Sequence, residues 1–87
     1  MKIIRYTADW CGPCRQLVAV LKEANPRVDI EVVDVDKEPE RTKENNVRGV
    51  PTMQLLSDSG NEISRKVGAL TKAQLVSWFD SNGVPHE

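Results

Sequence analysis

Trp10-Cys11-Gly12-Pro13-Cys14 is the stretch of this 87-residue sequence that decides the fold, because a strand pattern precedes it and a helix pattern follows it. Lys2–Thr7 is rich in β-branched and aromatic residues, which predicts a strand. Apolar side chains then recur at i, i+3, i+4 and i+7, which predicts an amphipathic helix ending at Asn25-Pro26. That stripe consists of Cys14, Leu17, Val18 and Leu21. The two cysteines therefore bracket the start of a helix that follows a strand.

The middle of the chain predicts a second strand, a short helix and a hairpin. Ile30–Val35 is almost continuously apolar, as is typical of a strand covered on both faces. The charged segment 36–46 predicts a short solvated helix with Pro39 in its first turn. Thr52–Leu56 and Glu62–Val67 are two further strand patterns, and the turn-rich residues between them predict an antiparallel hairpin.

The last helix has the clearest boundary signals. Thr71 followed by Gln74 predicts a capping box, and Leu70 with Leu75 occupies the positions of a hydrophobic staple. Asn82-Gly83 predicts the end of the helix. Its expected buried face consists of Leu75, Trp78 and Phe79.

These elements predict an α/β fold of order β-α-β-α-β-β-α in a single domain spanning residues 1–87. A helix joins the first two strands, so they should be parallel with a right-handed crossover, and the last helix should pack back on the sheet. The hairpin makes the sheet mixed.

Composition excludes several function classes. Twelve Lys and Arg against thirteen Asp and Glu give a formal net charge of −1, so no field steers the chain to nucleic acid or to an anionic membrane. No apolar run approaches the roughly 18 residues of a membrane span, and Met1–Arg5 turns polar too soon for a signal peptide. We therefore expect a cytoplasmic monomer that binds neither nucleic acid nor a membrane.

The sequence contains two cysteines, and three uses compete for them. A structural zinc site needs a second pair of ligands, whereas the only histidine is His86 near the chain end, so we expect no metal. A disulfide closing a four-residue loop would stabilise the fold by only about 1.9 kcal/mol, against about 3 kcal/mol for a 15-residue loop. A dithiol that cycles is the interpretation we favour, with the Cys11–Cys14 disulfide as the redox group and no bound cofactor.

The spacing assigns different roles to the two thiols. Cys11 lies at a helix N-terminus, where free N–H groups and the macrodipole favour a thiolate, so we expect it to attack a substrate disulfide. Cys14 lies one turn on, on the core-facing stripe, so it should be less exposed and should then attack Cys11 to release the reduced product. Gly12 and Pro13 support the site, and Pro13 fits the first helical turn and stiffens the loop.

Trp10-Cys11-Gly12-Pro13-Cys14 resembles the signature of the thioredoxin family, and three further segments agree with it in order and spacing. Arg48–Thr52 is similar to the loop that carries the family's cis-proline. Val67–Leu70 before a capped helix is similar to its C-terminal hairpin exit, and Asp34–Asp36 to the end of its central strand. The resemblance covers about residues 3–83 and implies a thioredoxin-like fold with a four-stranded mixed sheet.

The resemblance also implies roles for individual residues. Cys11 would be the nucleophile and Cys14 the resolving thiol. Pro51 would follow a cis peptide and leave the backbone of Val50 free to pair with an extended substrate. A flat apolar collar would then dock the substrate, formed by Trp10, Gly49, Val50, Gly68 and Ala69. The plainer alternatives are that Trp10 is a core aromatic, Gly68 only a hairpin exit and Pro51 an ordinary trans turn.

Two departures from the family are visible. Only ten residues precede Cys11, so we expect the family's first strand and helix to be missing and the second strand to lie at a sheet edge. Arg5 and Val32 occupy the positions of the family's buried aspartate and the lysine across from it. Arginine cannot act as a base near neutral pH. Arg5 should either keep its head in water or lie under the sulfurs and favour their thiolate forms.

The expected function is therefore thiol-disulfide exchange that reduces protein disulfides, recharged by a thioredoxin-reductase-like electron donor. One alternative is a dedicated, glutaredoxin-like electron donor to a single enzyme such as ribonucleotide reductase. Another is a non-catalytic binding module on the same scaffold. We expect residues 37–44 and the tail 84–87 to be solvated surface, with His86 as a disordered terminal residue.

Overall fold

The computed structural model describes residues 1–87 and has the element order that the sequence predicts. The elements are β1 (Lys2–Thr7), α1 (Gly12–Ala24), β2 (Asp29–Asp34), α2 (Pro39–Glu44), β3 (Thr52–Leu56), β4 (Glu62–Val67) and α3 (Lys72–Ser81). The four strands form one mixed sheet of order β2-β1-β3-β4. β1 runs parallel to β2 and antiparallel to β3, which is also antiparallel to β4.

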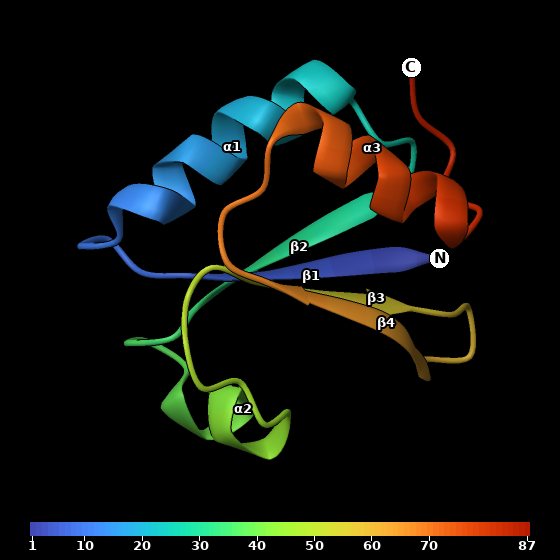
Figure 1. Cartoon of the computed structure of the whole chain (residues 1–87). Helices are drawn as coiled ribbons and strands as arrows, with labels where there is room; N and C mark the ends of the chain where they lie inside the picture. The colour runs from blue at the N-terminus through green and yellow to red at the C-terminus, as the bar shows by residue number, and fades with distance from the viewer.

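The sheet separates two apolar layers. α1 and α3 lie together over one face of the sheet, and α2 lies on the other (Figure 1). Side chains alternate along β1, so Ile3 joins the larger core under α1 and α3, whereas Ile4 and Tyr6 join the smaller core on the α2 side. Burying each such large apolar side chain stabilises the fold by roughly 1.5–3 kcal/mol.

α1 forms and ends as its sequence predicts. Cys11 is the N-cap residue and Pro13 lies in the first turn. The apolar stripe is buried except for Val18, which is half-buried. Asn25 ends the helix in the left-handed conformation, with φ of 46°, and its N–H donates to the carbonyl of Leu21.

α3 starts with the predicted capping box. The N–H of Gln74 donates to Thr71 Oγ1 at 3.1 Å, and the N–H of Thr71 donates to Gln74 Oε1 at 3.0 Å. Trp78 is buried, and its Nε1–H donates to Ser64 Oγ at 2.8 Å, which ties the helix to β4. The helix ends at Asn82 and Gly83, as expected.

β2 lies at the sheet edge, as expected, but its predicted cover on both faces is wrong. Val33 is fully buried on the α2 side, whereas Ile30 is 38% and Val32 51% exposed on the α1 side. The physical reason is that a groove lies between α1 and β2 on this side, so the helix does not cover Ile30 and Val32. The strand also begins and ends one residue earlier than predicted.

The prediction that the tail 84–87 is solvated and His86 disordered is wrong for Val84 and His86, whereas Pro85 and Glu87 are exposed. Val84 is 3% exposed within the larger core, and His86 forms a β-bridge with Pro26. His86 Nε2 lies 2.8 Å from Asp80 Oδ1, and the histidine ring lies 5.8 Å from that of Phe79. The tail is held because Val84 is buried in the core and His86 contacts both α3 and the loop after α1.

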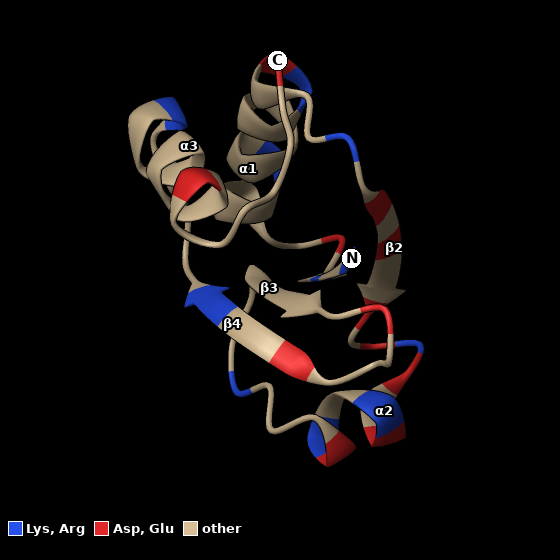
Figure 2. Cartoon of the chain, turned by 90° about the vertical axis from the view of Figure 1, so that its right-hand side faces the viewer, with Lys and Arg blue, Asp and Glu red and all other residues tan.

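α2 is shorter than its charged segment and contributes no buried residue, so polar contacts hold it to the sheet. The Arg41 guanidinium donates to Glu31 of β2, which also pairs with Lys2. Behind the helix, Arg65 of β4 donates to the carbonyl of Asn45 at 2.7 Å. Figure 2 shows how α2 mixes cations and anions along its short length.

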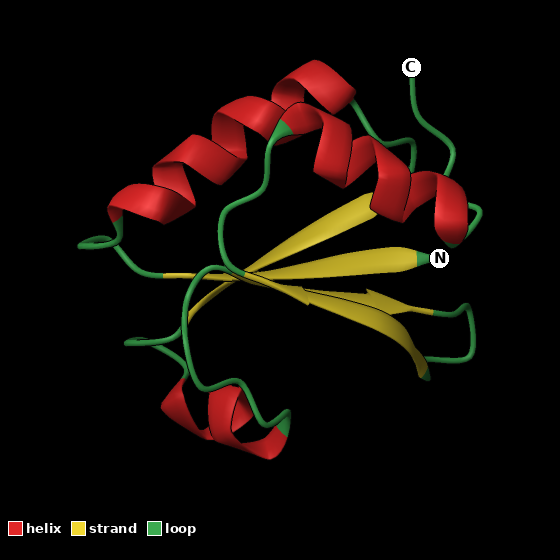
Figure 3. Ribbon diagram, in the orientation of Figure 1, coloured by secondary structure: helices red, strands yellow, loops and turns green.

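The topology brings four loops to one end of the sheet. β1, β2 and β4 all finish at this end, and β3 starts there, because β3 alone runs the opposite way. Figure 3 shows the connecting loops gathered at this end, beside the N-terminus of α1. Trp10, Val35, Val50 and Gly68 are therefore brought together although they are far apart in sequence.

Candidate active site

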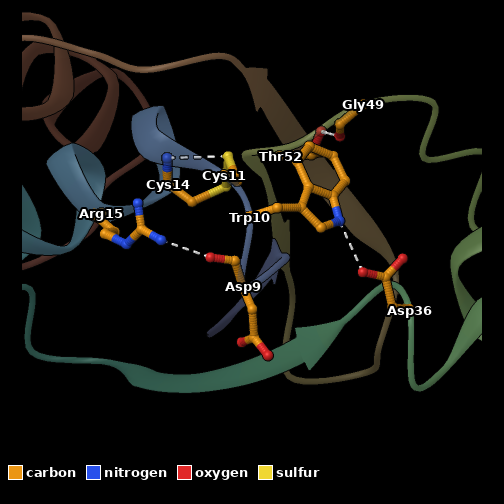
Figure 4. The surroundings of a disulfide bond; sticks show 8 residues. All are labelled: Asp9, Trp10, Cys11, Cys14, Arg15, Asp36, Gly49 and Thr52. Carbon is orange, nitrogen blue, oxygen red and sulfur yellow. Dashed lines mark hydrogen bonds between the residues drawn. A yellow bond between two sulfur atoms is a disulfide. The ribbon is translucent and has the colours of Figure 1, made fainter.

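The two cysteines form a disulfide at the N-terminus of α1. Cys11 is the N-cap with extended backbone, at φ −90° and ψ 104°, and Cys14 lies one turn later, with 5.3 Å between the two Cα atoms. The N–H of Cys14 donates to Cys11 Sγ at 3.1 Å (Figure 4). A donor on this sulfur, added to the positive end of the helix, stabilises a Cys11 thiolate in the reduced state.

Burial distinguishes the two cysteines by only a small margin. Cys14 is 2% exposed and Cys11 4% exposed, and both pack with Ala8 in one small cluster. Position separates them more clearly, because Cys14 lies on the sheet-facing stripe of α1 while Cys11 precedes the helix. Gly12 and Pro13 lie exposed between them.

Trp10 is not a core aromatic, since it is 68% exposed beside the disulfide. Its indole Nε1–H donates to Asp36 Oδ2 at 2.8 Å, which fixes the ring between the loops after β1 and β2 (Figure 4). On the other side Arg15 donates to the carbonyl of Asp9 at 2.7 Å. The short loop that carries Trp10 and Cys11 is therefore held by contacts at two adjacent residues, Asp9 and Trp10.

The Val50-Pro51 peptide is cis, and Pro51 is buried. Val50 packs against the cluster of the two cysteines, and no hydrogen bond within the protein uses its N–H or C=O. The neighbouring backbone is well held, because the N–H of Gly68 donates to the carbonyl of Pro51 at 2.8 Å and Thr52 Oγ1 donates to that of Gly49 at 2.8 Å. Val50 therefore presents free backbone groups beside the disulfide.

The expected collar residues gather at the same end of the sheet. Trp10, Gly49 and Val50 line one pocket, and the bond to Pro51 brings Gly68 to the same loop, followed by the exposed Ala69. Gly68 has φ of 92°, a left-handed conformation that favours glycine.

The sequence interpretation missed three residues that belong to this region. Val67 is 65% exposed at the end of β4, where it pairs with Thr52. Its position directly before Gly68 was the available signal. The contacts of Asp36 with Trp10 and of Arg15 with the Asp9 backbone have no sequence signal, because they depend on how the loops meet.

Arg5 faces α1 and pairs in register with Val32, as the alignment of the motifs implied. Its side chain lines a shallow groove between α1 and β2, together with Val18, Lys22 and Ile30. Neither cysteine lines this groove, and the guanidinium makes no hydrogen bond or ion pair within the protein. Partial burial lowers the pKa of the Arg5 guanidinium, which remains far too high for a base at neutral pH.

No group of three or more His, Cys, Asp or Glu side chains is placed to hold a metal ion. None of the three helices combines the length and apolarity that crossing a bilayer requires.

A Cys-x-x-Cys disulfide at a helix N-terminus, facing a cis X-Pro loop on this sheet, defines a thiol-disulfide oxidoreductase with the thioredoxin fold. Residues 1–81 match the family described as Thioredoxin, and the chain belongs to that family. Its Cys11–Cys14 pair is the redox-active disulfide of a thioredoxin-type enzyme with protein-disulfide reductase activity.

Individual relatives agree over almost the whole chain. The thioredoxin of Pseudomonas aeruginosa is 36% identical over 84 residues, covering 92% of this chain and 77% of the relative. The thioredoxin of Chlamydia trachomatis is 38% identical over 83 residues, covering 92% and 80%. A solved mutant thioredoxin from Halobacterium salinarum NRC-1 superposes with a TM-score of 0.82 at 30% identity, covering 93% of this chain and 73% of that one. The β-α-β-α-β-β-α thioredoxin fold is thereby confirmed.

Proposed function

We propose that this protein reduces disulfides of protein substrates in the cytoplasm as a single-domain monomer, and that a thioredoxin-reductase-like donor recharges it. Cys11 is the nucleophile and Cys14 the resolving thiol. The observation that carries the assignment is the 3.1 Å hydrogen bond from the Cys14 N–H to Cys11 Sγ at the start of α1. That donor stabilises negative charge on one sulfur and not on the other.

The reaction has two exchange steps. The Cys11 thiolate attacks one sulfur of the substrate disulfide, forms a mixed disulfide and releases the other substrate sulfur as a thiolate, which takes up a proton. Cys14 then loses its proton and attacks Cys11 Sγ, which expels the second substrate thiolate and forms the Cys11–Cys14 disulfide. Two electrons pass from the protein to the substrate, and the reductase returns them.

The collar supplies docking through backbone groups and apolar side chains. The free N–H and C=O of Val50 support β-augmentation by an extended substrate segment beside the disulfide. Trp10 and Val67 provide exposed apolar surface on either side. Backbone pairing recognises no particular side chain, which suits an enzyme that acts on several proteins.

Proton removal from Cys14 runs through water in this proposal. Arg5 occupies the position at which the family resemblance implies a carboxylate. Its side chain lies in the groove between α1 and β2 without a polar partner. Arg5 therefore acts at most on the electrostatics of the sulfurs and not as a base.

Insulin-disulfide reduction with dithiothreitol tests the proposal. Wild type should accelerate insulin precipitation, whereas Cys11→Ser and Cys14→Ser should both fall to the uncatalysed rate. A non-catalytic binding module would leave all three proteins at that rate and would contradict the proposal.

A second assay identifies the electron donor. NADPH with thioredoxin reductase should sustain turnover, and glutathione alone should not. Turnover with glutathione alone would instead assign the protein to the glutaredoxin-like alternative.

A further inference from the structure

A pocket of about 550 Å³ borders the disulfide on the α2 side. Trp10 and Val50, which flank the cysteines, form one wall, and α2 with the loop after it forms the other. The floor is apolar, with the partly buried Val35 and the buried Val47. A substrate segment paired with Val50 would therefore lie beside this pocket.

The charged residues that line the pocket are both cations. Lys43 and Arg48 line it, no acidic side chain does, and neither cation has an ion-pair partner within 4 Å in the protein. The charged residues of α2 are divided between its faces. Lys43 lines the pocket, whereas Glu40 and Glu44 do not. The nearby Asp36 already accepts the indole N–H of Trp10.

The C-terminus of α2 does not oppose an anion here. Helix C-terminal carbonyls carry partial negative charge, but Arg65 donates to the carbonyls of Asn45 and Asn46, at 2.7 and 3.1 Å. These bonds satisfy the two carbonyls, while Arg65 is itself paired with Glu62 at 2.6 Å. The side chain of Asn46 lines the pocket, and its amide is a potential donor.

We propose that this pocket is a specificity subsite for an acidic side chain of the protein substrate, with Lys43 and Arg48 as its cations. The inference rests on the proposed function, because the substrate cysteine must lie at Cys11 for its neighbours to reach the pocket. A strand rises about 3.3 Å per residue, so the residues within two positions of that cysteine can occupy a pocket that begins at Trp10 and Val50. A carboxylate there pairs with the cations while its stem covers the apolar floor.

Matched heptapeptides test the subsite. Each carries one cysteine as a mixed disulfide with thionitrobenzoate, and Glu, Gln or Lys at each position from two before to two after it. The rate constant for reaction with the reduced protein is read from thionitrobenzoate release. At one of these positions the rate should fall in the order Glu, Gln, Lys.

Variants connect that preference to the pocket. Lys43→Gln and Arg48→Gln should each lower the rate of the Glu peptide about threefold to fivefold at low salt, since an exposed ion pair contributes up to about 1 kcal/mol. Both should leave the Gln peptide unchanged. Lys22→Gln removes one charge at the far end of α1 and should alter neither rate.

The outcomes are distinguishable. A Gln peptide reduced only at the uncatalysed rate contradicts the proposed function itself. The subsite alone is overturned if the Gln peptide is reduced as fast as the Glu peptide. It is also overturned if the preference for Glu survives in the variant that combines Lys43→Gln with Arg48→Gln. If the variants slow the reduction of glutathione disulfide but not that of the Glu peptide, the pocket binds glutathione, and its assignment to protein substrates is wrong.

Discussion

Replacing Glu31 by Gln tests how α2, which forms one wall of the pocket beside the active site, is held to the sheet. Hydrogen bonds from Arg41 and then from Lys2 lower the pKa of Glu31 from its ordinary 4.5 to about 2. At about 1.4 kcal/mol per pH unit this difference would correspond to roughly 3 kcal/mol. The Glu31 side chain is 32% exposed, however, so solvent screens the pairs and we expect about 1 kcal/mol.

The sign and the pH range follow from the depressed pKa. The contribution is fully present above the unfolded pKa near 4.5 and is lost as the pH falls through the folded value near 2. Urea unfolding should therefore show Glu31→Gln about 1 kcal/mol less stable at pH 7, or about 4–8 °C lower in Tm, with the two proteins converging towards pH 2.

A matched control is Glu23→Gln, since Glu23 is exposed on α1 and makes no ion pair. It should match wild type at every pH. The reasoning is refuted if Glu31→Gln is as stable as wild type at pH 7, or if its deficit persists unchanged to pH 2.5.

Three further predictions concern the proton path, a helix cap and the tail. Arg5→Asp restores a carboxylate and should speed resolution of the mixed disulfide by Cys14 up to about 100-fold, with a new pH dependence. Stopped flow measures this rate against pH. If neither the rate nor its pH profile changes, proton removal through water does not limit resolution. Thr71→Ala should cost about 1 kcal/mol in urea unfolding without altering insulin reduction, and a silent substitution would contradict the cap. Asp80 raises the pKa of His86 above its ordinary 6.5, so the Asp80–His86 pair stabilises the fold below pH 6.5 and ceases to do so as the pH rises through the folded pKa. NMR titration should show that Asp80→Asn lowers the pKa of His86. An unchanged pKa would show that the two side chains do not interact.

Local patterns predicted most of the fold. Three local signals lie within a few residues of the elements they specify: the change of hydrophobic period at Cys11, the capping box at Thr71 and the hairpin turn. The strands β1, β3 and β4 have the predicted bounds. The exposed side of β2 was not predictable from its apolar run, because exposure depends on which neighbours the sheet provides. The fixed tail depends likewise on the long-range meeting of Pro26 with His86.

The candidate site divides in the same way. Cys11, Cys14 and the loop before Pro51 carry their chemistry in residue type and spacing, so the sequence identifies them. The contact between Trp10 and Asp36 arises only when the loops after β1 and β2 meet. Which charged residues of α2 line the pocket could not be predicted either. The sequence of a charged six-residue helix does not indicate which face lies beside the disulfide.

Mass spectrometry of a trapped intermediate tests the central claim, that Cys11 attacks and Cys14 resolves. Reduced Cys14→Ser is mixed with a disulfide-bonded protein substrate, quenched in acid and digested, with reduced Cys11→Ser as the matched control. We predict a stable substrate adduct on Cys11 of the first variant and little or none on Cys14 of the second. Equal adducts on both cysteines, or an adduct on Cys14 alone, would contradict the assigned roles.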